Sequence, residues 1–195
     1  MLYPKPEERY LNMEQAELLK TMKEKAEGVQ AVVSCIKSLD DAFDYLIDLT
    51  EKQGGRAVTA PGLNGGMPDI LKKRCEERKL KLLTPPLRPH TSDIHASLTL
   101  ADWGIAETGT LVLNSGSEDI RIATMLAETH VAVLRASKIR KSAGDLEDEL
   151  NAVLKAGSPA YMAFITGASR TADIERVLAI GVHGPQELHI LIMED

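Results

Sequence analysis

The chain has 195 residues, of which 44% are apolar and 27% charged, and its formal net charge is −6. These values are typical of one soluble globular domain with a full hydrophobic core, and they exclude a disordered, collagenous or disulfide-stabilised chain. Acidic residues outnumber basic ones by 29 to 23, and aromatic residues make up only 4%. We therefore expect no nucleic-acid partner, because an acidic surface repels phosphates and few rings are present to stack on bases.

The two cysteines, Cys35 and Cys75, lie far apart and form no Cys-x-x-Cys pair. Because four thiolates usually hold an iron–sulfur cluster, we expect neither a cofactor nor a metal site in this chain. Isolated cysteines fit a reducing cytoplasm. The first residues contain no apolar signal region, and no apolar run approaches the roughly 18 residues of a membrane span. The sequence thus predicts a cytoplasmic protein without a membrane span.

The pattern of apolar residues alternates between helical and extended periods along most of the chain. In chain order it predicts a helix over 7–27, a strand over 31–36, a helix over 39–53, a strand over 56–59, a helix over 69–79, a strand over 110–113, a helix over 118–128, a strand over 130–134, a helix over 146–155, a strand over 161–166, a helix over 172–180 and a strand over 188–193.

The alternation predicts an α/β fold in three Rossmann-like layers. The strands over 110–113 and 161–166 are continuously apolar, which favours a mostly parallel sheet with helices on both faces. We treat residues 1–28 as an N-terminal helical segment and residues 29–195 as the α/β domain.

Ligands of open α/β sheets bind at the carboxyl ends of strands, so polar loops expected there are candidate sites. Three such loops stand out: residues 105–110 with their continuation at 114–117, residues 166–173, and residues 181–185. In the second loop, Gly167 permits close backbone approach, and Ser169 or Thr171 can cap the predicted helix. Arg170 adds a planar fork suited to a carboxylate or phosphate. An anion site and ordinary helix capping with Arg170 in solvent both explain this pattern.

Two further side chains are candidates for proton transfer. Glu107 lies beside Thr108, Gly109 and Thr110, so its carboxylate can act as a base, as a nucleophile or as an acceptor within its own turn. His183 lies in a loop between glycines, where it can be a general base or a turn residue. The other histidines show no metal-ligand spacing, and His130 and His189 belong to predicted strands, which favours structural roles.

Three motifs of the chain resemble the lactate utilization protein C family. They are residues 101–113 (ADWGIAETGTLVL), 165–175 (ITGASRTADIE) and 181–185 (GVHGP), in the order and spacing of that family. Arg121 matches a frequent family arginine, whereas the Leu-Pro pair usual before the next strand is replaced by Leu126-Ala127. The resemblance implies a LUD domain, with a fold similar to the sugar-isomerase and CoA-transferase superfamily.

The resemblance also implies a function. Members of the family act in bacterial oxidation of L-lactate to pyruvate beside two iron–sulfur proteins of the same operon, so clusters are expected in those partners. On this basis Arg170 would hold the carboxylate of a small acid such as lactate, with the helix terminus behind it. Glu107 or His183 would take the hydroxyl proton. The predicted anion-binding residues are Thr108, Gly109, Thr110, Arg121, Gly167, Ser169, Arg170 and Thr171.

Two other classes of function remain open from the sequence. Glu107 followed by Thr108-Gly109 loosely resembles the nucleophile loop of CoA-transferases, which favours acyl transfer or sugar-phosphate isomerisation. Alternatively, the chain is a non-catalytic assembly or regulatory subunit. In that case the basic segment Lys72-Lys73-Arg74 is either a docking face or a solvated helix face.

Overall fold

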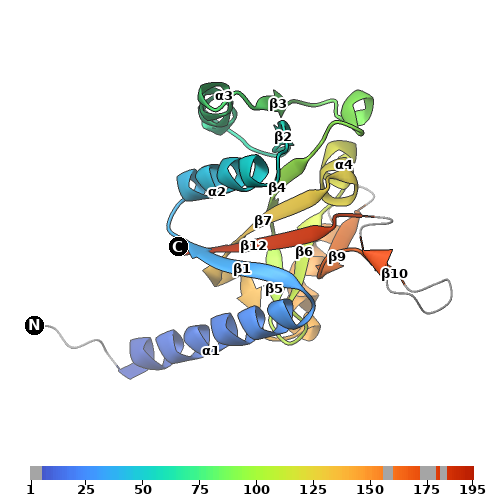
Figure 1. Cartoon of the computed structure of the whole chain (residues 1–195). Coiled ribbons are helices and arrows are strands. Elements are labelled where there is room, and N and C mark those ends of the chain that lie inside the picture. The colour runs from blue at the N-terminus through green and yellow to red at the C-terminus, as the bar shows by residue number, and fades with distance from the viewer. Residues whose placement is uncertain (1–5, 156–159, 172–178, 181–183) are drawn as a thin grey trace, which may run out of the picture.

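A computed structural model describes residues 6–155, 160–171, 179–180 and 184–195 (Figure 1). Its centre is a six-stranded sheet in the order β1-β12-β7-β4-β2-β3, in which every neighbouring pair is parallel. The strands are β1 (Ala31–Ile36), β2 (Ala57–Thr59), β3 (Lys81–Leu83), β4 (Ala96–Ala101), β7 (Thr129–Arg135) and β12 (Glu187–Met193). The α/β fold with a mostly parallel central sheet is thereby confirmed.

Alternate residues of the central strands pack into two different cores. Val131 and Val133 of β7 face the core under helices α2 (Leu39–Lys52) and α3 (Met67–Glu77), which also contains Phe43 and Leu71. Ala132 and Leu134 face the opposite core, which contains Met22 of α1 (Pro6–Gly28). Since both faces are covered, the central strands can be apolar at every position.

Helix α4 (Glu118–Leu126) lies on the same side of the sheet as α1. The hydroxyl of Ser97 on β4 donates to the carbonyl of Ala123 on α4 at 2.6 Å. This side also carries a second sheet in the order β8-β5-β6-β9. Its strands are β5 (Trp103–Ile105), β6 (Thr110–Asn114), β8 (Ile139–Arg140) and β9 (Met162–Thr166). Helix α5 (Glu147–Lys155) precedes β9, and short 3-10 turns occur at Arg88–His90, Ala136–Lys138 and Ala143–Leu146.

The second sheet corrects the assignment of two predicted strands. β6 pairs antiparallel with both β5 and β9, so residues 110–113 and 161–166 do not belong to the parallel sheet. β6 is continuously apolar because Leu111 faces one core and Val112 another. A continuously apolar strand indicates that both of its faces are buried, but it does not indicate whether the strand is parallel or antiparallel to its neighbours. The strand over 161–166 is also less buried than expected, because Phe164 is half exposed.

A second correction concerns the segment after β9. Arg170–Thr171 form strand β10, which pairs antiparallel with β11 (Ala179–Ile180). The predicted helix over 172–180 is therefore wrong at its C-terminal end, and residues 172–178 lie outside the described residues. Arg170 lies on a strand and not in the first turn of a helix.

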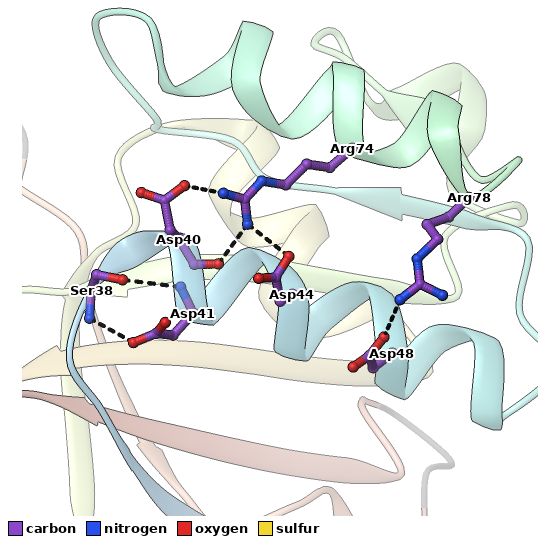
Figure 2. Close-up of polar contacts among 7 residues, drawn as sticks. All are labelled: Ser38, Asp40, Asp41, Asp44, Asp48, Arg74 and Arg78. Atoms are coloured by element: carbon purple, nitrogen blue, oxygen red, sulfur yellow. Dashed lines mark hydrogen bonds and ion pairs between the residues drawn. The ribbon is translucent and has the colours of Figure 1, made fainter.

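Helix α2 forms as the sequence predicts. Ser38 caps it through a reciprocal pair of bonds with Asp41, and the N–H donors of this cap, first that of Lys37, lower the pKa of the Asp41 carboxyl. Figure 2 shows how α3 lies against it: Arg74 pairs with Asp40 and Asp44, while Arg78 pairs with Asp48. Arg74 of the basic segment thus faces α2 and is not free to dock a partner.

Candidate functional site

The fold brings the three family-like motifs together at the amino ends of β1 and β12. Hydroxyl groups of Thr108, Thr110 and Thr166 form a chain with Oγ1–Oγ1 distances of 2.7 Å, which joins the first motif to the second. The backbone N–H of Ser169 donates to the carbonyl of Pro185 at 2.9 Å, which joins the second motif to the third. We call this region the motif cluster.

Two glycines of the motif cluster, Gly109 and Gly167, are packed against the protein's own backbone. Gly109 has φ +65°, and an added Cβ there would lie 2.3 Å from the nitrogen of Ala26. Gly167 has φ +74°, and its Cβ would lie 2.2 Å from the carbonyl oxygen of Val29. The close approach predicted at Gly167 therefore exists, but the end of α1 and the turn after it occupy the space that we assigned to a ligand.

Glu107 sits at the turn between β5 and β6. Its N–H donates to the carbonyl of Lys141 at 3.0 Å, and its Oε1 accepts the N–H of Ala143 at 3.3 Å. The carboxylate is exposed and lies beside the start of a 3-10 turn. His183 lies outside the described residues, so whether it meets Glu107 stays a prediction.

The two predicted arginines lie in different surroundings. Arg170 is exposed on β10, and within the described ranges it forms no ion pair. Arg121 lies on α4, where its guanidinium donates to the carbonyls of Ser115 and Gly116 and lies 5.9 Å from the centroid of the Tyr161 ring. Arg121 therefore binds the far end of β6 from Thr110 and is outside the motif cluster, whereas Arg170 stays available to an anion.

The histidines of the described region take part in packing and hydrogen bonding. His130 is fully buried, its Nε2 meets the hydroxyl of Thr99 at 2.8 Å, and burial lowers its pKa to about 4. Its Nδ1 has no hydrogen-bond partner among the described residues. The ring is therefore neutral at neutral pH.

A polar network lies at the amino ends of β7 and β12, beneath the end of α2. Gln53 is its centre: its amide donates to Glu187 at 2.9 Å and accepts from Thr129 at 3.1 Å. His95 meets the same amide oxygen at 3.1 Å. We call this the amino-edge network, and its members are Tyr45, Gln53, His95, Glu128, Thr129, Glu187 and His189. Each side chain in it has a partner within the network.

The opposite edge of the sheet contains a feature that the sequence did not reveal. A cavity of about 430 Å³ lies at the carboxyl ends of β1, β4, β7 and β12, and three cations, Lys37, Arg135 and Lys138, line it. In Figure 1 this edge is on the left beside the C-terminus, and β10 is on the right. Ala101, Asp102 and Trp103, with which the first motif begins, line it too. The sequence signal for this cavity is a basic residue at the end of a strand. Only the strand order shows that these strand ends lie side by side.

The described residues contain neither a metal-binding cluster nor a membrane-spanning helix. No group of three or more His, Cys, Asp or Glu side chains is arranged there to hold a metal ion. No helix in the described part of the chain is long and apolar enough to cross a membrane.

Comparison with known proteins identifies the class. The model of the LUD domain matches residues 19–193, and the chain therefore belongs to the LUD domain family. A solved structure of a DUF162 family protein from Deinococcus radiodurans is similar, with a TM-score of 0.62 over 92% of this chain and 98% of that one. At 19% sequence identity, that likeness shows the fold alone.

Curated relatives carry names that refer to lactate. Lactate utilization protein C of Halalkalibacterium halodurans is 37% identical over 102 residues, which are 50% of this chain and 44% of that protein. Lactate utilization protein C of Deinococcus radiodurans is 30% identical over 138 residues, which are 70% of this chain and 59% of that protein. The matched regions thus span about half the length of these relatives.

Proposed function

We propose that the protein acts in lactate utilization, as a subunit of a complex that oxidises L-lactate to pyruvate. Membership of the LUD domain family and the names of the relatives support this role. The structural observation that carries it is the convergence of the three motifs, which are distant in sequence, around Thr110, Thr166 and Ser169.

In this proposal the chain binds substrate and does not carry electrons. Arg170 is exposed and unpaired within the described residues, and its planar fork can donate hydrogen bonds to both oxygens of a carboxylate. Oxidation of lactate to pyruvate breaks the O–H and Cα–H bonds and removes two electrons and two protons. We assign the hydroxyl proton to Glu107 or His183 as base. The two electrons, together with the proton from Cα, are assigned to the redox centre that the two iron–sulfur proteins of the same operon supply.

The experiment is anaerobic lactate-dependent dye reduction by the purified iron–sulfur proteins, with and without this chain. We expect activity only when the chain is added. Arg170→Ala should raise the KM for lactate at least tenfold, which corresponds to about 1.4 kcal/mol of lost binding. Arg78→Ala, which removes an exposed arginine of α3, is the matched control and should leave the KM unchanged.

Either of two results contradicts the proposal. Partners that are equally active alone show that the chain is no working subunit. A wild-type KM in the Arg170→Ala variant removes Arg170 from the carboxylate site while leaving the subunit role intact.

A further inference from the structure

The cavity at the carboxyl edge lies away from the motif cluster. Strands of six or seven residues separate the two edges of the sheet, a distance of about 20 Å at roughly 3.3 Å per residue. Lys37 follows β1, Arg135 ends β7 and Asp102 follows β4. A ligand bound here would therefore not touch Arg170 or the glycines of the cluster.

The lining of the cavity contains three cationic and two anionic side chains. Lys37 and Lys138 form no ion pair within the described part of the chain, and the nearest carboxylate to Arg135 is that of Asp195 at 3.9 Å. Of the two acidic residues in the lining, Asp102 already accepts the N–H of Asn114 at 2.6 Å, and Glu194 is exposed. Three cations around one hollow are notable in a chain of net charge −6.

Two helices begin at this face. Leu39 and Met67 are the first residues of α2 and α3, and both line the cavity. Acidic residues in the first turn of each helix, Asp40 and Asp41 in α2 and Asp69 in α3, offset the partial positive charge of these N-termini, so the side-chain cations carry the case for an anion. One guanidinium fork and two ammonium groups match the several oxygens of a phosphate better than the two oxygens of a carboxylate.

The other wall of the cavity is apolar. Leu100 at the end of β4 keeps 43% of its surface exposed, and Trp103 is only partly buried beside it. An exposed leucine and an indole next to a group of cations suit a ligand that carries an organic body on its anionic group.

The volume is in the range of small-molecule sites. At about 430 Å³, the cavity falls within the roughly 300 to 1,000 Å³ typical of pockets that bind organic ligands.

We propose that this cavity is a second ligand site, which binds the monophosphate ester of a flat or apolar organic group. Lys37, Arg135 and Lys138 hold the phosphate, and Leu100 and Trp103 contact the organic body. The site is separate from the proposed lactate site, because Trp103, although it belongs to the first motif, lies at the opposite edge of the sheet from Thr110, Thr166 and Arg170.

The test is isothermal titration of the isolated full chain with phenyl phosphate, in the absence of lactate. We expect saturable binding at millimolar concentration or tighter, with inorganic phosphate and phenol each at least tenfold weaker. Phenylacetate, which has the same ring on a carboxylate, and lactate should also bind at least tenfold more weakly.

Variants at this edge provide the second arm. Arg135→Ala and Lys37→Ala should each weaken phenyl phosphate binding about tenfold, which corresponds to about 1.4 kcal/mol. Lys52→Ala is the matched control, because Lys52 ends the same helix that Lys37 precedes and the charge change is identical. Urea midpoints close to that of the wild type establish that the variants are folded.

Three outcomes would overturn the proposal. They are the absence of saturable binding, binding of phenylacetate or inorganic phosphate as tight as that of phenyl phosphate, and equal weakening by Lys52→Ala and Lys37→Ala. None of these bears on lactate-dependent dye reduction, so the two proposals fail separately.

Discussion

The two edges of the central sheet differ in whether their polar side chains have partners within the protein. At the amino edge, Gln53 links Glu187, Thr129 and His95, and every side chain of the network has a partner. At the carboxyl edge, the ion pair between Arg135 and Asp195, at 3.9 Å, is the only one that a cavity cation forms among the described residues.

The difference shows where stability and binding each reside. A satisfied, half-exposed network holds α2 and the strands together, because leaving any of its groups unpaired would cost free energy. Unpaired charges around a hollow contribute little to folding and remain free for a ligand. We therefore expect substitutions within the amino-edge network to change stability, and substitutions of the cavity cations to change binding.

The largest loss of stability should follow Gly167→Ala. The new side chain must adopt a left-handed backbone conformation, and its Cβ would lie 2.2 Å from the carbonyl oxygen of Val29. Together these effects should lower the free energy of unfolding by about 3 to 4 kcal/mol, measured by urea denaturation. Gly66→Ala is the control at the other edge, since Gly66 has φ −81° and nothing within 4 Å of an added Cβ. Equal losses in the free energy of unfolding would show that the backbone after α1 does not pack closely against Gly167.

The next largest effect should come from His130 in acid. Burial lowers its folded-state pKa to about 4 from the ordinary histidine value of 6.5. Between pH 6.5 and pH 4 the unfolded chain binds a proton at this histidine, whereas the folded chain does not. The free energy of unfolding that is present above pH 6.5 is therefore lost as the pH falls toward 4. At about 1.4 kcal/mol per unit, the loss reaches about 2 to 3 kcal/mol. Denaturation of His130→Gln across the same pH range should be less acid-sensitive, and an unchanged pH profile would show that His130 is not its source.

A smaller loss is expected for Gln53→Ala, which removes the centre of the amino-edge network. Three hydrogen-bonding partners lose their contact, and part of the loss is recovered by water at this half-exposed edge. We expect the free energy of unfolding to fall by about 1 to 2 kcal/mol. Gln186→Ala is the control, because Gln186 is exposed and only its backbone bonds to Glu128. A loss no greater than that of the control would mean that the network contributes nothing to stability.

The smallest effect on stability should be that of Arg135→Ala at the cavity. Its side chain is 58% exposed and its guanidinium lies 3.9 Å from its nearest carboxylate, so the pair should contribute less than about 0.5 kcal/mol. Urea denaturation of this variant beside Gln53→Ala compares the two edges directly. A larger loss of unfolding free energy for Arg135→Ala than for Gln53→Ala would show that the cavity, and not the amino-edge network, contributes more to stability.

The sequence predicted those elements whose local signals agree with their surroundings. Helix α2 has a Ser38 cap, an apolar stripe and a glycine stop, and it forms almost as predicted. Strand β4 was missed although its residues 96–100 alternate between apolar and polar, a pattern that indicates a strand. The alternation predicts one solvated face, whereas the hydroxyls of Ser97 and Thr99 are buried against Ala123 and His130, which are distant in sequence.

The candidate site was predictable only in part. The motifs do converge, but the glycines that suggested ligand contact instead accommodate the backbone at Ala26 and Val29. The cavity cations were missed because Lys37 and Arg135 come from strands that are neither adjacent in sequence nor paired with each other. A periodicity argument detects which face of an element is buried, whereas strand order decides which strand ends meet.

The position of β12 has a consequence for synthesis of the chain on the ribosome. This strand is the last of the sheet to be made, yet it pairs with β1 on one side and β7 on the other. β1 has no other strand partner in the described sheet, so it must wait for about 150 residues of further translation before its hydrogen bonds can form. During that interval the apolar residues of β1 and the end of α1 are exposed to chaperones, and folding should be completed only after the C-terminal strand has left the exit tunnel.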